Sequence, residues 1–268
     1  MIYKIGFIGC GNMGGALAIA AAKGVPEAKI AVYDPDTQKA LALAEQFDNV
    51  IATDEIDLVS NSKFIFIGVK PQMLETCFNE IRPYLLSRPN SFALVSMAAG
   101  TSMETIEKLA QTDCAVIRIM PNTSVAIGKG VVLYCANKKG EEHLADFLYC
   151  LRFAGITDRI DENKIDAASA VSGCGPAFVY MFIEALADGA VEIGIPRDKA
   201  LTYAAAMVSG AAENALTSGT HPEALKDAVC SPGGTTIAGV HALENKAFRS
   251  AVSDAVIAAY EKTLKLKK

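Results

Sequence analysis

The fold of this chain is decided by the stretch Lys4-Ile5-Gly6-Phe7-Ile8-Gly9-Cys10-Gly11-Asn12-Met13-Gly14. It is a short apolar run that ends in three glycines and leads into the alanine-rich segment 16–23. As strand, turn and helix, it places glycine where a dinucleotide-binding unit needs residues without a Cβ. Gly9 makes the tight turn, Gly11 lets the backbone approach a pyrophosphate, and Gly14 lets the helix pack close to the strand. The stretch therefore predicts a dinucleotide site at a helix N-terminus, whose free N–H groups suit phosphates.

A second predicted strand, Lys29-Ile30-Ala31-Val32-Tyr33, ends at Asp34, about 20 residues beyond the last of these glycines. A dinucleotide fold places an acid there to bind the ribose hydroxyls, and this acid would repel a 2′-phosphate. Because no arginine follows it closely, although Lys39 lies within reach, this rule favours NAD over NADP. The alternative is that Asp34-Pro35-Asp36 simply begins the next helix.

Later apolar runs repeat this pattern of a strand followed by polar or small residues. The run 64–69 precedes Lys70-Pro71-Gln72, and the run 91–97 closes on Ala98-Ala99-Gly100, which leaves room for a flat ring. Further strands are expected over 114–120 and 130–134, before a helix over 138–154. Strands that alternate with helices predict a parallel sheet, whose carboxyl ends form the ligand-binding edge. We therefore expect an α/β domain of the Rossmann type over residues 1–162.

The second half of the chain differs from the first in composition and in the periodicity of its apolar residues. Beyond about residue 160 the β-branched runs stop, and alanine-rich segments with helical periodicity predict an all-helical domain over residues 163–268. The breaks fall at Ser172-Gly173-Cys174-Gly175 and at 231–236. Helices with alanine faces must approach closely, and about four or five of them make a thin core for one chain. We therefore predict a helix-exchanging homodimer.

Composition sets outer limits on partners and compartment. Of the 268 residues, 51% are hydrophobic and 21% are charged, which is typical of a compact globular protein. The formal charge of −5 argues against nucleic acid or an anionic membrane as partner. We expect no stretch long and apolar enough to span a bilayer and no signal peptide ahead of the first strand, and therefore a cytoplasmic protein. The seven cysteines form no Cys-x-x-Cys pair, so we expect neither a metal site nor a disulfide framework.

Residues suited to proton transfer are few. His143, His221 and His241 are each expected to be structural or exposed. Glu162 lies at the predicted domain junction, where it could face a ligand or only cap a helix. The segment Ser231-Pro232-Gly233-Gly234-Thr235-Thr236 offers amides and hydroxyls ahead of a helix, which suits a carboxylate. A capped helix after a flexible turn is the alternative interpretation of this segment.

One set of blocks extends from one end of the chain to the other: Phe7-Ile8-Gly9-Cys10-Gly11-Asn12-Met13-Gly14, Val69-Lys70-Pro71-Gln72, Met120-Pro121-Asn122-Thr123, Val171-Ser172-Gly173-Cys174-Gly175-Pro176-Ala177, Glu184-Ala185-Leu186-Ala187-Asp188-Gly189, His221-Pro222, Leu225-Lys226-Asp227 and Ser231-Pro232-Gly233-Gly234-Thr235-Thr236-Ile237. In this order they resemble pyrroline-5-carboxylate reductase. The serine-proline-glycine-glycine block after leucine-lysine-aspartate is specific to that family. The first glycine motif is shared with many dehydrogenases.

The resemblance implies reduction of L-pyrroline-5-carboxylate to L-proline by hydride from NADH or NADPH, the final step of proline biosynthesis. Carried over by position, it implies cofactor contacts from Gly9, Cys10, Gly11, Asn12, Met13, Gly14, Asp34, Gly68, Val69, Lys70, Pro71, Met97, Ala98 and Ala99. It implies substrate contacts from Glu162, Ser231, Gly234, Thr235 and Thr236. A protonated imine can be taken from solution, so catalysis would depend on orientation, with a hydrogen bond between the catalytic Thr236 hydroxyl and the ring nitrogen.

Two positions depart from the family pattern. Ser124 replaces a proline that commonly follows the methionine-proline-asparagine-threonine block, and serine is tolerated in a turn. Ala228 stands where some relatives have an asparagine that touches the cofactor, so cofactor affinity or preference could differ.

Two other functions remain open at this point. A hydroxyacid dehydrogenase shares the first motif and a helical second domain, but it usually needs a basic residue there, and no motif supports Lys164, Lys199 or Lys226. A nucleotide-sensing binding protein could keep the fold without the chemistry, although the intact segment 231–236 argues against it. The sequence leaves open the choice between NADH and NADPH, assembly of dimers into a larger ring, feedback by proline, and other cyclic imines.

Overall fold

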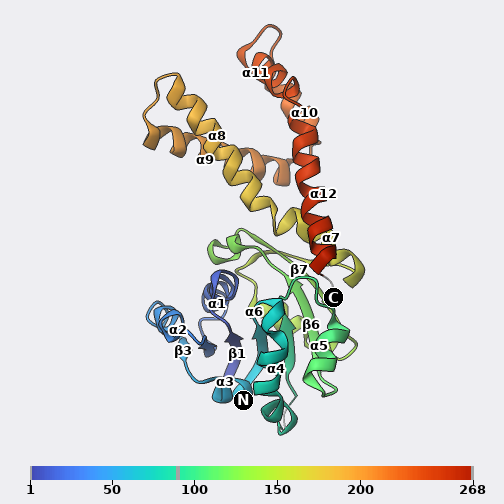
Figure 1. The fold of residues 1–268 in the computed structure, drawn as a ribbon. Helices are drawn as coiled ribbons and strands as arrows, with labels where there is room; N and C mark the ends of the chain where they lie inside the picture. Colours follow the sequence, from blue (N-terminus) through green and yellow to red (C-terminus); the bar gives the residue numbers. More distant parts are fainter. Residues whose placement is uncertain (1, 89–90, 267–268) are drawn as a thin grey trace. The chain divides into compact units, whose positions relative to one another are not determined.

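The computed structural model describes residues 2–88 and 91–266 (Figure 1). The chain divides into two compact units, one formed by Met1–Gly173 with Ala259–Lys268 and the other by Cys174–Ala258.

The first unit is built on an eight-stranded sheet with the order β3-β2-β1-β4-β5-β6-β7-β8. The strands are β1 (Tyr3–Ile8), β2 (Ile30–Tyr33), β3 (Val50–Ala52), β4 (Ser62–Ile67), β5 (Ala93–Ser96), β6 (Ala115–Met120), β7 (Gly130–Ala136) and β8 (Gly155–Arg159). All neighbouring strands pair in parallel except β6 and β7. The predicted α/β fold with a mainly parallel sheet is confirmed.

Two parts of the sheet differ from the sequence prediction. The strand over 130–134 was expected to be parallel, but β7 runs antiparallel to β6. The connection between them contains only η2 (Thr123–Ile127), and a parallel crossover needs about a dozen residues or more. Strand β8 was not predicted, because four of its five residues are exposed and it lacks an apolar run.

Helices cover both faces of the sheet in this unit. They are α1 (Asn12–Gly24), α2 (Thr37–Ala44), α3 (Glu55–Asn61), α4 (Leu74–Leu86), α5 (Met103–Ala110), α6 (Leu144–Cys150) and α7 (Glu162–Ser172), with the 3-10 turns η1 (Pro71–Met73) and η3 (Gly140–His143). The side chains of β4 are buried on both faces of the sheet. Phe64 and Phe66 belong to a buried apolar cluster on one face, and Ile65 and Ile67 belong to a second cluster on the other face. A strand buried on both faces reads as a continuous apolar run, as the sequence indicated.

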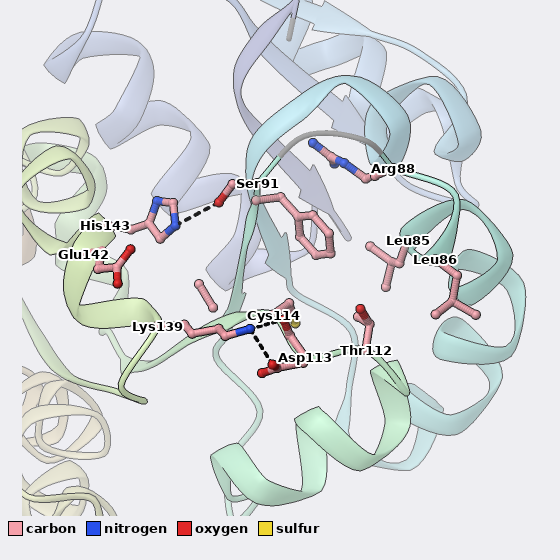
Figure 2. A pocket seen from close by; sticks show the side chains of 12 residues that line it. Leu85, Leu86, Arg88, Ser91, Thr112, Asp113, Cys114, Lys139, Glu142 and His143 are labelled. Atoms are coloured by element: carbon pink, nitrogen blue, oxygen red, sulfur yellow. Dashed lines mark hydrogen bonds and ion pairs between the residues drawn. The ribbon is translucent and has the colours of Figure 1, made fainter.

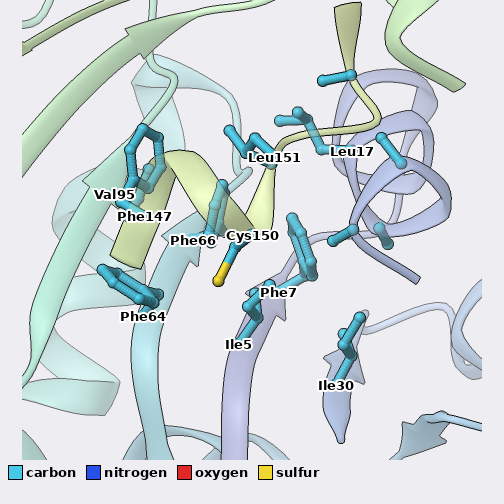
Figure 3. Packing of buried hydrophobic residues seen from close by; sticks show 14 of the residues in the cluster. Ile5, Phe7, Leu17, Ile30, Phe64, Phe66, Val95, Phe147, Cys150 and Leu151 are labelled. Carbon is cyan, nitrogen blue, oxygen red and sulfur yellow. The ribbon is translucent and has the colours of Figure 1, made fainter. Parts of the chain in front are cut away.

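Aromatic side chains pack together within the cluster that contains Phe64 and Phe66 (Figure 3). The ring of Phe66 lies 4.5 Å from that of Phe7 and 6.2 Å from that of Phe147, measured between centroids. These contacts join β1 and β4 to α6. They fix the two central strands whose carboxyl ends carry the first predicted cofactor loops.

The second unit is helical, as predicted. It contains α8 (Gly175–Glu192), α9 (Arg197–Ser218), α10 (Pro222–Ala228), α11 (Thr235–Glu244) and the first part of α12 (Phe248–Leu266). Its buried apolar cluster consists of Ala187, Ala200 and Ala204. Large apolar side chains such as Met181, which is 70% exposed, lie on its surface. The core of this unit is therefore thin, as the alanine-rich sequence indicated.

One helical stretch contradicts the expectation that no segment is long and apolar enough to cross a membrane. Glu162–Glu192 has 31 residues and a mean hydropathy of 1.4 in its most apolar window, and 11% of that window is buried. The predicted break at Ser172-Gly173-Cys174-Gly175 is confirmed, since α7 ends at Ser172 and α8 begins at Gly175, so the stretch of 31 residues joins two helices across this turn. Length and composition alone are weak evidence for a span, since a helix covered by another protein surface passes the same test.

The carboxyl group of Glu55 makes stability depend on pH. Burial raises its pKa from the ordinary 4.5 to about 7, and the Glu80 carboxylate adds to the rise. A carboxyl group whose folded pKa is raised lowers stability as the pH increases through this range, because the folded state holds the proton more tightly than the unfolded state. Solvent screening of the half-buried group and the α3 dipole, which favours the charged form, reduce the effect.

We expect Glu55→Gln to raise the free energy of unfolding by about 1–2 kcal/mol at about pH 8.5 and to leave it nearly unchanged at about pH 4. Urea unfolding at both pH values measures this difference. Glu75→Gln, on the exposed surface of α4, is the control and should have little effect at either pH. An equal gain from Glu55→Gln at both pH values would contradict the expectation.

Candidate dinucleotide and substrate site

The glycine turn after β1 depends on close backbone approaches. Gly9 has a φ of +97°, and a Cβ there would lie 3.0 Å from the Gly68 carbonyl group. A Cβ on Gly14 would overlap the carbonyl oxygen of Gly9. Around Gly11, by contrast, no atom lies within 4 Å of the position that a Cβ would take. The turn is thus tight where the helix meets the strand and open where the sequence predicts a pyrophosphate.

The N-terminus of α1 faces this open space. The helix begins at Asn12, and Gly11 precedes it in an extended conformation without a side-chain cap. Gly11 and Asn12 are both exposed. The first amides of a helix have no acceptor within the helix, so those of α1 can bind an anion.

Asp34, at the end of β2, is bound to the glycine turn. Its Oδ2 accepts a hydrogen bond from the backbone N–H of Cys10 at 2.7 Å, and its Oδ1 accepts one from Asp36 at 2.9 Å. The side chain of Lys39 lies 4.0 Å from Asp34 and 3.3 Å from Asp36. Helix α2 begins at Thr37 with Asp36 as its N-cap residue, so the segment Asp34-Pro35-Asp36 leads into the next helix, as the alternative expected.

Three loops meet at one edge of the sheet. Ile8 pairs with Ile67, and Ile67 pairs with Ser96, so β1, β4 and β5 end at the same level. The residues that follow these strands are therefore neighbours, and the N–H of Gly68 donates to the Ile8 carbonyl at 2.8 Å. The predicted cofactor segments 9–14, 68–71 and 97–99 are brought together at the carboxyl edge, where open α/β sheets bind ligands.

Glu162 is the first residue of α7 and belongs to a network that sequence reasoning missed. Its Oε1 accepts a hydrogen bond from the backbone N–H of Met103 at 2.7 Å and lies 3.5 Å from Nη1 of Arg118. Nη2 of Arg118 is 2.5 Å from Oδ1 of Asp166. One signal was present: Arg118 interrupts an otherwise apolar strand.

The segment 231–236 forms a corner before α11. Gly233 has a φ of +68°, the N–H of Gly234 donates to the Ser231 carbonyl at 3.0 Å, and α11 begins at Thr235. Gly234 is the N-cap residue of α11, and it makes no side-chain cap hydrogen bond. Ser231, Thr235 and Thr236 are exposed. A groove of about 510 Å³ along α11 includes Gly233, Gly234 and Ile237.

The histidines have the structural or exposed positions expected of them. Nδ1 of His221 accepts a hydrogen bond from the Glu223 N–H and caps α10, and His241 contacts Asn245 at 3.0 Å. His143 lies 3.3 Å from Ser91, and burial lowers its pKa. In residues 2–88 and 91–266, no three histidine, cysteine, aspartate or glutamate side chains are grouped as metal ligands.

A separate cavity of about 410 Å³ is lined by Arg88, Asp113, Lys139 and His143, among others (Figure 2). Its residues precede β5 and β6 or follow β7, so it lies at the amino ends of β5 and β6. Lys139 is paired there with Asp113. The cavity therefore lies at the opposite edge of the sheet from the segments 9–14, 68–71 and 97–99.

Fold and site together define a class of protein, the NAD(P)-dependent oxidoreductases with a Rossmann-type domain. Residues 4–100 match the family described as NADP oxidoreductase, coenzyme F420-dependent. Residues 162–266 match the family described as pyrroline-5-carboxylate reductase dimerisation, so the chain contains a dimerisation domain.

The chain is similar over its whole length to reductases of known name. It is 41% identical to the pyrroline-5-carboxylate reductase of Escherichia coli K12, covering 99% of this chain and 98% of the relative. It is 37% identical to the enzyme of Pisum sativum, covering 98% and 96%. The solved Plasmodium falciparum pyrroline carboxylate reductase, with NADP bound, matches with a TM-score of 0.85 at 32% identity over 99% of this chain and 98% of that one. The chain belongs to the pyrroline-5-carboxylate reductase family.

Gly14→Ala should destabilise the protein by about 2–3 kcal/mol, because the added methyl group would overlap the Gly9 carbonyl and push α1 away from the sheet. Gly11→Ala is the matched control: its surroundings are open and its φ of −68° suits alanine, so a loss of less than about 1 kcal/mol is expected. Urea unfolding of both variants measures the difference. Equal losses would contradict the close approach at Gly14.

Proposed function

We propose that this chain reduces L-pyrroline-5-carboxylate to L-proline with hydride from NADH or NADPH. The observation that carries the proposal is the convergence of three cofactor loops at one sheet edge in a chain that aligns with these reductases from end to end. Hydride transfer to a carbon–nitrogen double bond needs a bound dinucleotide and an oriented imine. The first unit offers a site for the dinucleotide, and the α11 corner offers a site for the imine's carboxylate.

The cofactor site fits a dinucleotide by its backbone. We propose that segment 9–14 holds the pyrophosphate on the α1 amides, since Gly11 leaves room for it. Asp34 would bind the adenosine ribose, because each carboxylate oxygen keeps a lone pair after accepting one amide bond. Segments 68–71 and 97–99 would contact the second ribose and the nicotinamide. When bound, the cofactor supplies the hydride.

The substrate carries a carboxylate and a ring nitrogen that must be protonated for hydride to add. We propose that the amides after Pro232 bind the carboxylate, with Ser231, Gly234 and Thr235 shaping this corner. The hydroxyl of Thr236 would accept the hydrogen bond of the protonated nitrogen. Glu162 would place a carboxylate close to the same positive charge. Orientation rather than proton transfer would then provide most of the catalysis.

Adding pyrroline-5-carboxylate should cause oxidation of NADH or NADPH, and Thr236→Ala should lower kcat by about tenfold to a hundredfold because the ring is no longer oriented. Thr236 is exposed, so the melting temperature should not change. The control is Thr202→Ala, at an exposed threonine of α9, with parental activity expected. Parental turnover in Thr236→Ala would remove this role, and oxidation of neither cofactor by the parent would reject the function.

We also propose that the protein is a homodimer formed through residues 163–268, with residues 1–162 as the cofactor domain. The match to a dimerisation family over 162–266 supports this division. So does the core of the second unit, in which three alanines are buried while large apolar side chains are exposed. A small-molecule substrate, without nucleic acid or membrane as partner, suits the charge of −5. Seven free thiols support a reducing, cytoplasmic compartment.

Sedimentation should give a mass of about twice 28.3 kDa, or a higher multiple if dimers form a ring. Met181→Glu should shift the protein towards the monomer, because it places a charge on an apolar surface that a partner would cover. Ile127→Glu is the control, since Ile127 is also exposed but lies outside the dimerisation family match. A monomeric parent protein would contradict the proposal.

A further inference from the structure

Arg118 is a charged side chain in the middle of the sheet. It lies on β6, where it pairs with Ser96 of β5 on one side and Cys135 of β7 on the other. Its side chain is 3% exposed. A guanidinium group buried to this extent is stable only when carboxylates compensate its charge with good geometry. The position of those carboxylates therefore indicates what the arginine holds in place.

Both carboxylates come from one face of α7. Asp166 and Glu162 are four residues apart and so lie on the same side of the helix. Asp166 is 1% exposed and contacts Nη2 at 2.5 Å, whereas Glu162 is 31% exposed and lies 3.5 Å from Nη1. The two ends of the guanidinium fork thus bind a buried acid and a partly exposed acid. The planar fork suits this double contact, which a lysine ammonium cannot reproduce.

The two oxygens of Glu162 have different surroundings. Oε1 faces Arg118 and also accepts the hydrogen bond from the Met103 N–H, at the first residue of α5. Among the described residues, no contact engages Oε2. Helix α5 follows the segment 97–99 that is assigned to the nicotinamide side of the cofactor. One oxygen is therefore fixed to the cofactor domain, and the other is available to a ligand.

We propose that Arg118 is a positioning residue for the reaction: together with the Met103 amide it fixes Oε1 of Glu162, so that Oε2 faces the protonated ring nitrogen of the imine. The inference rests on the proposed function, in which Glu162 contacts the substrate. Arg118 itself touches neither substrate nor cofactor. Its effect on the reaction passes through Glu162, which gives the proposal a specific test.

A double-mutant cycle on Arg118 and Glu162 tests this dependence. Arg118→Lys and Glu162→Gln should each raise the KM for pyrroline-5-carboxylate about tenfold, and the double variant should raise it no further than one of them alone. The KM for NADH or NADPH should stay within about twofold in all three. Arg159→Lys, at an exposed arginine of β8, is the control and should change nothing. Multiplicative effects in the double variant would overturn the proposal.

Arg118→Lys could disturb folding by weakening the pairing of buried Asp166. A second variant, Arg118→Gln with Asp166→Asn, removes both charges together and so avoids an isolated buried carboxylate. If its melting temperature is parental, its substrate KM should still rise about tenfold, and a parental KM would overturn the proposal. If Glu162→Gln alone leaves the KM unchanged, the proposed substrate role of Glu162 fails instead.

Discussion

The carboxyl edge of the sheet, where we propose that the dinucleotide binds, depends on two close backbone approaches to Gly9. In the first approach, Gly14 in the first turn of α1 lies against the Gly9 carbonyl group. In the second, Gly68, which follows β4, lies against the same carbonyl group. Neither approach tolerates a Cβ, so the absence of side chains decides the geometry. Because of them, the free amides of α1 and the segment after β4 reach the same point on the sheet edge. Asp34 then ties the end of β2 to this turn through the Cys10 amide.

A second constraint is electrostatic and lies deeper. Arg118 occupies a sheet position that an apolar side chain would fill more easily, and its burial forces α7 to present acids to it. Such a pair contributes little net stability, since desolvation offsets the attraction. What it does provide is a defined position for the start of α7 relative to α5 through the shared Glu162 oxygen. The buried charge of Arg118 thus fixes the geometry of this region and adds little to the free energy of unfolding.

The sequence allowed much of the fold to be predicted, because the decisive signals are local. Two patterns predict the local structure of the segments in which they occur: the spacing of Gly9, Gly11 and Gly14, and the apolar run of β4. The direction of β7 depends on the length of its connection, which apolar patterning does not measure, and β8 is too polar to show a pattern. The Arg118 network joins residues that lie far apart in the sequence: Asp166 is 48 positions from Arg118, and Met103 is 59 positions from Glu162. Long-range charge pairing has no periodic signature in a single sequence.

Small side chains have opposite consequences in the two units. At the glycine turn they allow backbone contacts that build a site within one chain. In the helical unit, alanines such as Ala187, Ala200 and Ala204 leave little apolar area to bury, so the large exposed side chains must find a partner surface. The proposed substrate corner at the start of α11 belongs to this unit. If its helices are stabilised by association, the order of that corner is linked to assembly, because binding that stabilises the folded state shifts every equilibrium that depends on it.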